Sequence, residues 1–350
     1  MIKDRLIIYG ANGYSAQLII EELISRKIEP ILTGRNESVL KQIAQKYNCD
    51  YIAFDIFDDV KVDESLQDVH TLLNCAGPFK YTAKDLMEAC LRTKTNYLDI
   101  TGEMPVMHLA FSLDKIAKER GIVILPSVGF DIIPTDCLAK RLSEQMPDAT
   151  HLKLGFLNKR GNISRGTWLT TLEFLGGTGK IRRHGKLIDS KIGEFTINVT
   201  AKDFSFSGIS IPWGDVYSSY YSTGIENVEV YLALPKVVVM FRPLLVFFLK
   251  ILKVQFIKNI VVNYIKKNFT GPTKEERDST ETYVWGRVEN SKGKMIEEVY
   301  QFMEGYNLTA KGAAECAERV LKNSLQPGTY TPSLAFGSDF MDLFIVKKID

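Results

Sequence analysis

Short β-branched runs alternate with helical patterns from residue 5 to residue 125, and this alternation constrains the fold more than any other feature. The strand-like runs lie at 5–9, 29–33, 50–54, 71–75, 96–100 and 122–125. Helical spacing of apolar residues lies at 13–25, 37–47, 85–93, 105–120 and 134–145. Strands separated by helices pair in parallel through right-handed crossovers. We therefore expect an α/β fold with a Rossmann doubly wound parallel sheet.

The turn after the first strand has a GxxGxxA pattern. Gly10 permits a tight turn, Gly13 lets backbone amides approach a pyrophosphate, and Ala16 is small enough for close helix–strand packing. The helix that begins there offers amides and its positive dipole end to phosphates. An ordinary strand–turn–helix shares the pattern, but its place at the first βα turn favours a dinucleotide site. The residues predicted to bind are Gly10, Ala11, Asn12, Gly13, Tyr14 and Ser15.

The end of the second strand distinguishes NAD from NADP. An NAD site usually has Asp or Glu there, bound to the ribose 2′-hydroxyl. Here Arg35 and Asn36 follow the strand, with no acid before Glu37. Arg35 can offer a fork of donors to a 2′-phosphate, and Lys41 is a weaker second contact. The pattern predicts NADP(H); the alternative is that Arg35 solvates a surface turn.

Two further turns face the same edge of the predicted sheet. Asp55 closes the third strand and either accepts from the adenine amino group or caps a turn. Cys75, Ala76, Gly77 and Pro78 form a small loop after the fourth strand, which lets the backbone pass along the cofactor. We interpret Cys75 as a small buried hydrophobe rather than a nucleophile, because no His lies nearby in sequence to activate it.

Three carboxylates follow the fifth and sixth strands, where a doubly wound sheet holds its ligands. Asp99, Glu103 and Asp131 could hold a ribose or the nicotinamide amide, or have structural roles. They are also the candidate catalytic residues, as a proton source if desolvation raises their pKa. For Glu103, which precedes Met104-Pro105, the structural alternative is pairing with a helix N-terminus.

Several motifs resemble those of the saccharopine dehydrogenase-like oxidoreductases. In the first half these are residues 10–14, 33–35, 74–79, 97–103 and 129–136. Residues 164–167, 271–277 and 328–332, before Gly337, agree in the second half. The branch that looks nearest contains trans-acting enoyl reductases and lipid-associated members. The family's usual third glycine in the phosphate turn is Ala16 here. The resemblance implies an NADP-dependent oxidoreductase and a C-terminal helix that returns to the nucleotide domain.

A chain of 350 residues leaves room for two domains. We place the boundary after the helix at 134–145, which gives an NADP-binding Rossmann domain at 1–147. Residues 148–308 are expected to form an α+β substrate or dimerisation domain. Its β-rich runs at 195–199, 228–233, 281–289 and 295–302 suggest an antiparallel sheet. Residues 309–350 carry the returning helix.

An apolar, basic segment at 234–269 departs from an ordinary enzyme. It contains seven Lys or Arg residues, and no acid lies between Glu229 and Glu275. Its longest uncharged run, 243–249, is far shorter than a membrane span needs. Helices lying in a bilayer interface, a buried helical layer and a homodimer interface with snorkelling lysines all fit the pattern.

Composition excludes several classes of function. Forty-four Lys and Arg balance 42 Asp and Glu, so no nucleic-acid partner is expected. Five cysteines without a CxxC pair argue against a disulfide framework and a zinc site, and we predict no metal. The first ten residues run directly into a strand, so we expect no secretory signal and a cytoplasmic protein, peripheral to membranes if segment 234–269 binds lipid.

These features favour an NADPH-dependent oxidoreductase that reduces a C=C, C=N or C=O bond of a small-molecule substrate that is apolar or lipid-linked. An amino-acid or polyamine dehydrogenase of the saccharopine type is one alternative, although the cations Arg160, Arg165, Arg182 and Arg183 are not spaced to clamp three carboxylates. A lipid-surface binding protein that keeps the cofactor fold without turnover is another. Further candidate proton donors are Tyr81, Ser164, Thr167 and His184.

Overall fold

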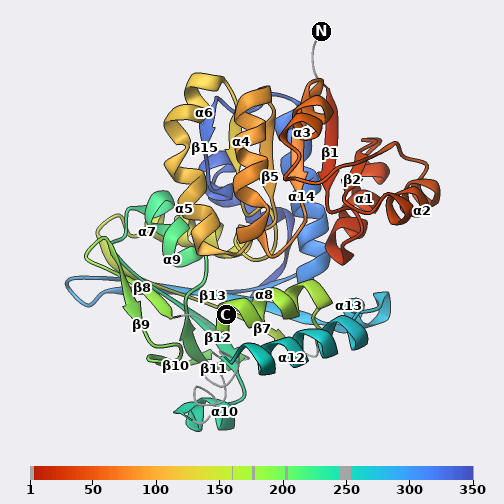
Figure 1. The fold of residues 1–350 in the computed structure, drawn as a ribbon. Coiled ribbons are helices and arrows are strands. Elements are labelled where there is room, and N and C mark those ends of the chain that lie inside the picture. The colour runs from red at the N-terminus through yellow and green to blue at the C-terminus, as the bar shows by residue number, and fades with distance from the viewer. Residues whose placement is uncertain (1–3, 160, 176–177, 202–203, 244–253, 350) are drawn as a thin grey trace. The chain divides into compact units, whose positions relative to one another are not determined.

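The computed structural model describes residues 4–159, 161–175, 178–201, 204–243 and 254–349 (Figure 1). Contacts divide the chain into two compact units, Met1–Ile133 with Tyr306–Ala335, and Pro134–Gly305 with Phe336–Asp350. The division follows Ile133, the first residue of α7 (Ile133–Gln145), whereas we expected a boundary after this helix. The reason is tight packing within the second unit, where a Cβ on Gly286 would come within 2.8 Å of Leu142 Cδ1 on α7.

The first unit is built on a seven-stranded sheet in the order β15-β6-β5-β4-β1-β2-β3, and every ladder is parallel. The strands are β1 (Arg5–Tyr9), β2 (Ile31–Gly34), β3 (Tyr51–Ala53), β4 (Val69–Asn74), β5 (Asn96–Asp99), β6 (Val123–Leu125) and β15 (Gly328–Thr329). The order 3-2-1-4-5-6 is that of a doubly wound dinucleotide fold, so the predicted fold class is confirmed. The short seventh strand, β15, was not predicted.

Helices cover this sheet. They are α1 (Tyr14–Ser25), α2 (Glu37–Tyr47), α3 (Asp59–Leu66), η1 (Phe79–Tyr81), α4 (Ala83–Thr93), α5 (Met104–Ser112), α6 (Asp114–Arg120) and α14 (Gly305–Leu321). Helices α3 to α6 contact one another (Figure 1). Arg26, at the end of α1, forms ion pairs with Glu315 (2.5 Å) and Glu318 (3.0 Å) of α14. Ion pairing thus ties the late helix α14 to the first βα unit.

The prediction of a single helix at 105–120 is wrong, because the structure has two helices there. The chain leaves α5 at Leu113 and begins α6 at Asp114. Asp114 Oδ1 accepts a hydrogen bond from the backbone N–H of Thr329 in β15 (2.9 Å). This contact links residues far apart in sequence, so the local apolar pattern does not encode the break.

The second unit holds a nine-stranded sheet in the order β10-β11-β12-β7-β13-β14-β16, with β8 pairing to β12 and β9. The strands are β7 (Ala149–Lys159), β8 (Gly179–Arg183), β9 (Lys186–Ser190), β10 (Thr196–Ala201), β11 (Phe204–Ile211), β12 (Asn227–Leu234), β13 (Glu281–Asn290), β14 (Met295–Phe302) and β16 (Ile345–Ile349). All ladders are antiparallel, as expected, except that of β7 with β12. Trp285, 0% exposed, lies in its core against Phe206.

The described helices of the second unit are α7, α8 (Arg165–Leu175), α9 (Asp215–Thr223), α10 (Lys236–Met240), α12 (Gln255–Asn268), α13 (Lys274–Ser279), α15 (Pro332–Phe336) and η2 (Ser338–Leu343), α15 lying on the boundary of the two units. The basic apolar segment supplies α10 and α12, and its residues 244–253 lie outside the described part. Among the described residues, we find no helix whose length and apolar character would let it cross a bilayer.

Candidate nucleotide-binding site

The glycine turn connects β1 to α1 at the carboxyl edge of the first sheet. The backbone amides of Gly10 (2.9 Å) and Ala11 (3.2 Å) donate to the carbonyl of Thr33 at the end of β2. Gly13 is the N-cap of α1 and brings no side chain to the amides of the first turn. The amides in the first turn of a helix find no acceptor inside that helix, so this turn can present N–H donors to an anionic group.

Gly10 is required by both conformation and space. Its φ of +84° lies in the left-handed region. A Cβ at this position would lie 2.8 Å from Ala76 Cβ and 2.9 Å from the Ala76 backbone N. The turn therefore lies against the loop that follows β4, where Cys75 N–H donates to the carbonyl of Tyr9 (2.8 Å).

The remaining residues predicted in this turn are not equally accessible. Ala11 is 0% exposed, Asn12 is exposed, and Tyr14 and Ser15 are half-buried. The Tyr14 ring packs edge-on against Tyr306 of α14, with ring centroids 5.0 Å apart. Ala11 can therefore contribute backbone alone, whereas Asn12 and Ser15 have side chains at the surface of the turn.

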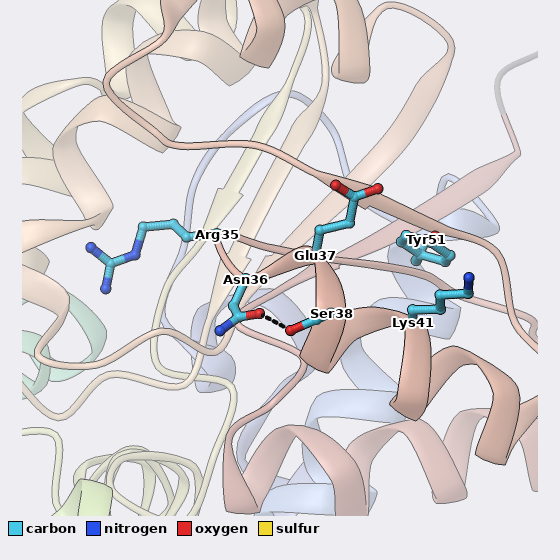
Figure 2. A pocket seen from close by; sticks show the side chains of 6 residues that line it. All are labelled: Arg35, Asn36, Glu37, Ser38, Lys41 and Tyr51. Atoms are coloured by element: carbon cyan, nitrogen blue, oxygen red, sulfur yellow. Dashed lines mark hydrogen bonds between the residues drawn. The ribbon is translucent and has the colours of Figure 1, made fainter.

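A cavity of about 840 Å³ opens at the carboxyl end of β2. Its lining residues are Arg35, Asn36, Glu37, Ser38, Lys41 and Tyr51 (Figure 2). Arg35 is exposed and extends away from Glu37, while Lys41 points to the side of Tyr51. Asn36 has a local role, because its Oδ1 caps α2 by accepting from Val39 N–H (3.2 Å) and Ser38 Oγ (2.8 Å). Two cationic side chains thus border one cavity.

Asp55 caps its own turn, as one of our two alternatives required. Its Oδ1 accepts from Phe57 N–H at 3.1 Å. Burial raises the pKa of Tyr9 to about 12, with the Arg35 charge opposing the shift and the Asp55 charge adding to it. Both groups therefore act on the same tyrosine at the end of β1.

Glu103 forms hydrogen bonds with the loop that follows β4, beside the glycine turn. Its carboxylate is 9% exposed and accepts from the backbone N–H groups of Phe79 (2.7 Å) and Lys80 (2.9 Å). The residues before them, Gly77 and Pro78, are exposed and half-buried. The carboxylate thus accepts from the start of the short helix η1, while Glu103 itself is the N-cap of α5 and forms no side-chain cap hydrogen bond there.

Asp99 is fully buried and connects the loops that follow β5 and β6. Its Oδ1 accepts from the backbone N–H groups of Thr101 (3.0 Å) and Ser127 (2.8 Å), and its Oδ2 accepts from Tyr97 Oη (2.9 Å). Asn74 Nδ2 donates to the same Tyr97 oxygen. Burial raises the pKa of Asp99 to about 6, and its carboxylate, 0% exposed, holds these two loops in place.

Asp131 is the half-buried member of the carboxylate trio. A Cβ on Gly102 would lie 2.8 Å from Asp131 Oδ2, so a larger residue at position 102 would displace this side chain. Burial, with a smaller effect of the Glu103 charge, raises the pKa of Asp131 to about 7. A carboxyl group with such a pKa exchanges a proton near neutral pH.

Cys75 is not a reactive thiol in this structure. It is 9% exposed, and burial together with the nearby Asp99 charge raises the pKa of its thiol far above the ordinary value. The thiolate needed for nucleophilic attack is therefore suppressed. This agrees with its interpretation as a buried hydrophobe.

The proton-donor candidates of the second unit have local structural roles. Ser164 Oγ accepts from the N–H of Thr167 (3.2 Å) at the start of α8. His184, with φ +49°, forms the turn of the β8–β9 hairpin together with Gly185. Tyr81, in the first unit, is 58% exposed. These contacts do not single out a proton donor among Tyr81, Ser164, Thr167 and His184.

Asn74, Tyr97 and Tyr51 were missed as site residues. Asn74 and Asp99 lie opposite each other in the β4–β5 ladder, and Tyr97 and Asp99, two residues apart, share a face of β5. This period of two was a usable signal for the pair Tyr97–Asp99. Tyr51 had no such signal, because it reaches the cavity through pairing of β3 with β2.

The strand order, the glycine turn and the basic cavity at the end of β2 define the first unit as a dinucleotide-binding Rossmann domain. Residues 6–125 match the family model described as saccharopine dehydrogenase NADP binding domain. The first unit is therefore similar to the NADP-binding domain of saccharopine dehydrogenases, and the chain resembles the saccharopine dehydrogenase-like oxidoreductases.

Relatives and a solved structure agree with this assignment. The saccharopine dehydrogenase-like oxidoreductase of Rattus norvegicus is 26% identical over 206 residues, 51% of this chain and 48% of the relative. A trans-acting enoyl reductase of Mycobacterium ulcerans is 27% identical over 139 residues, 37% of this chain and 33% of the relative. The chain thus spans about half the length, or less, of these curated relatives.

The fold of the whole chain also has a solved counterpart. The apo saccharopine dehydrogenase (L-Glu forming) of Saccharomyces cerevisiae matches with a TM-score of 0.67 and 13% identity, covering 99% of this chain and 100% of that one. At this identity the similarity shows a shared fold.

Proposed function

We propose that the protein is an NADPH-dependent reductase that acts on a C=C, C=N or C=O bond of an apolar or lipid-linked substrate. The observation that carries the cofactor preference is Arg35, exposed at the end of β2 in the cavity that Lys41 also lines. An NAD-preferring site usually has an acid at this place, whereas a guanidinium binds a 2′-phosphate through two parallel N–H donors.

The residues of the first unit fit a dinucleotide. Gly10 and Gly13 leave the backbone of the turn uncovered. A Cβ on Gly10 would meet Ala76, and a Cβ on Gly13 would lie 3.2 Å from the Gly10 carbonyl oxygen. The first-turn amides of α1 would donate to the pyrophosphate, and residues 75–78 would lie along it. When bound, the reduced nicotinamide supplies a hydride. The chain holds its loops in place through Asp99 and Glu103.

Asp131 best fits the role of proton donor among the three carboxylates. Asp99 is fully buried, and both oxygens of Glu103 are engaged by backbone amides. Asp131 is half-buried with a pKa of about 7, so a substantial fraction carries a proton at neutral pH. A proton held at its carboxyl oxygen would be available to the atom that gains charge as the substrate is reduced.

Two facts support an apolar substrate over a polycarboxylate. A relative is named trans-acting enoyl reductase, which points to C=C reduction. In the second unit, Arg182 is 4% exposed and donates to the carbonyls of Val216 and Gly185, while Arg183 pairs with Glu229. These two guanidinium groups are thus engaged within the protein. Arg165 is exposed, and Arg160 lies outside the described residues.

The cofactor preference is tested by Arg35→Ala. We expect the Kd for NADPH to rise at least about tenfold and the Kd for NADH to stay nearly constant, because one charge-assisted phosphate contact is lost. Binding is measured through the fluorescence of the reduced nicotinamide. Arg120→Ala, which removes an exposed arginine at the end of α6, is the matched control. Equal losses for both cofactors would refute the preference.

The substrate is tested by mass spectrometry of small molecules extracted from gently purified protein, followed by NADPH consumption with the compound found. An acyl lipid beside NADP, and its NADPH-dependent reduction, are the expected results. NADP alone, with turnover of a polycarboxylate amino acid, would support the saccharopine-type alternative. NADP binding without consumption of NADPH on any substrate would support a binding protein.

A further inference from the structure

Helix α12 (Gln255–Asn268) has one apolar stripe that packs on its own unit. Ile257, Val261 and Ile265 follow one another by four residues; Ile265 is 4% exposed and the other two are half-buried. The helix contacts α8, and Figure 1 shows the two side by side. Phe269, just after α12, lies 5.6 Å from Trp168 of α8, measured between ring centroids. One such stripe is enough to dock a surface helix on its domain.

The same helix carries a second apolar stripe on its exposed side. We call Phe256, Ile260 and Tyr264 the outer stripe; they are 74%, 53% and 61% exposed. They too are spaced by four residues, so they form a line about 12 Å long on one face. Tyr264 also packs edge-on against Phe269, with ring centroids 6.2 Å apart, yet all three side chains remain more than half exposed. Large apolar side chains grouped at the surface mark a site that binds something.

A shorter helix of the same segment repeats this pattern. On α10 (Lys236–Met240) and just after it, Val237, Met240 and Phe241 are 56%, 65% and 56% exposed, whereas Val239 is buried. With Val254, 53% exposed just before α12, seven large hydrophobic side chains are exposed among the described residues between 237 and 264. The remaining exposed hydrophobic residues of the described chain are scattered over both units.

The charge around the outer stripe is basic. Lys266 and Lys267 are exposed in the last turn of α12, and no acidic residue occurs from 230 to 274. The acids that follow belong to α13 and are engaged there. Asp278 pairs with Lys274 at 2.7 Å, and Glu276 forms a capping box with Thr273. Apolar side chains flanked by lysines are complementary to a surface with an apolar interior and an anionic outer layer.

We infer that α12 is an interfacial helix whose outer stripe enters the headgroup boundary of an anionic lipid surface, with Lys266 and Lys267 held near lipid phosphates. Helices of this composition lie in the plane of the interface, and each nearby lysine adds attraction to anionic lipid. A second copy of the chain fits less well, because a two-fold contact through this face would bring two wholly basic surfaces together. The inference is independent of the proposed reductase activity.

The test is sedimentation of the full chain with vesicles, without cofactor. We expect binding to vesicles of phosphatidylcholine with phosphatidylglycerol at low salt, and much weaker binding to phosphatidylcholine alone. Phe256→Ser and Ile260→Ser should each weaken partitioning about tenfold, because each removes a large apolar side chain from the interface. Lys266→Gln with Lys267→Gln should weaken binding to the anionic vesicles alone, by about tenfold or more.

The matched control is Phe57→Ser. Phe57 lies in the first unit, before α3, and is 75% exposed, nearly the same as Phe256. This variant should bind vesicles like the parent chain, and thermal melting should show that all variants fold. Absence of vesicle binding at low salt, or equal losses for Phe57→Ser and Phe256→Ser, would overturn the inference. Light scattering that shows a dimer broken by Phe256→Ser, without vesicle binding, would assign the stripe to a second copy instead.

Discussion

Replacing Gly10 by Ala tests whether the glycine turn is held by close approach to the loop after β4. Two costs follow from the structure. The φ of +84° places a side chain in the left-handed region, at about 1–2 kcal/mol. The new Cβ would also lie 2.8 Å from Ala76 Cβ and 2.9 Å from its backbone N, and relieving such crowding costs about 1–3 kcal/mol. We therefore expect a loss of about 2–5 kcal/mol in the free energy of unfolding.

Gly121→Ala is the control that separates the two costs. Gly121 has a similar φ of +73°, but a Cβ there meets nothing within 4 Å in the described part of the chain. Urea unfolding followed by circular dichroism should show Gly10→Ala less stable than Gly121→Ala by about 1–3 kcal/mol. The affinity for NADPH should fall at least about tenfold in Gly10→Ala alone, because the turn must move away from Ala76. Equal stability of the two variants, or unchanged NADPH affinity, would refute this reasoning.

Two more predictions concern buried ionisable groups. The pKa of Asp99 is about 6 in the folded protein and 3.8 ordinarily, so its contribution to the free energy of unfolding falls by about 3 kcal/mol as the pH rises from about 4 to about 6. Asp131, with a pKa of about 7, adds a decline of its own over the same window. Urea unfolding should therefore show a decline that is smaller in Asp99→Asn than in the parent by about 3 kcal/mol. Thiol labelling of the native protein at neutral pH, followed by mass spectrometry, should modify half-buried Cys49 before Cys75, because Cys75 is buried and burial raises the pKa of its thiol. Rapid labelling of Cys75 before the protein unfolds would contradict its burial.

The apolar periodicities were sufficient to predict the first sheet. The six predicted strands correspond to β1–β6, and the helix predicted at 37–47 has the bounds of α2. Gly10, Gly13 and Arg35 were predicted at the carboxyl edge because turns between strand and helix have local requirements. Such requirements depend on residues within a few positions of each other, so one sequence is enough to read them.

The second unit was predicted less completely. Strands β8, β9, β11 and β16 and helix α9 were missed, and the parallel β7–β12 ladder was not foreseen. Strand β9, for example, has the mixed sequence KLIDS, is largely exposed and pairs with β8. Whether such a segment forms a strand depends on pairing with its neighbours, because β propensity reflects packing context more than an intrinsic preference of the residues.

The sequence by itself determined where phosphate-binding turns and candidate charges lie along the chain. Only the tertiary structure decided what those charges do. Glu103 holds amides 23 and 24 residues away, and Asp99 joins a neighbouring turn to Ser127, 28 residues on. Likewise, the apolar and basic composition of segment 234–269 is visible in the sequence. Which side chains of α12 are buried and which are exposed depends on its packing against α8. Burial and hydrogen-bond partners arise from contacts between distant segments, and these contacts set the pKa and accessibility of each group.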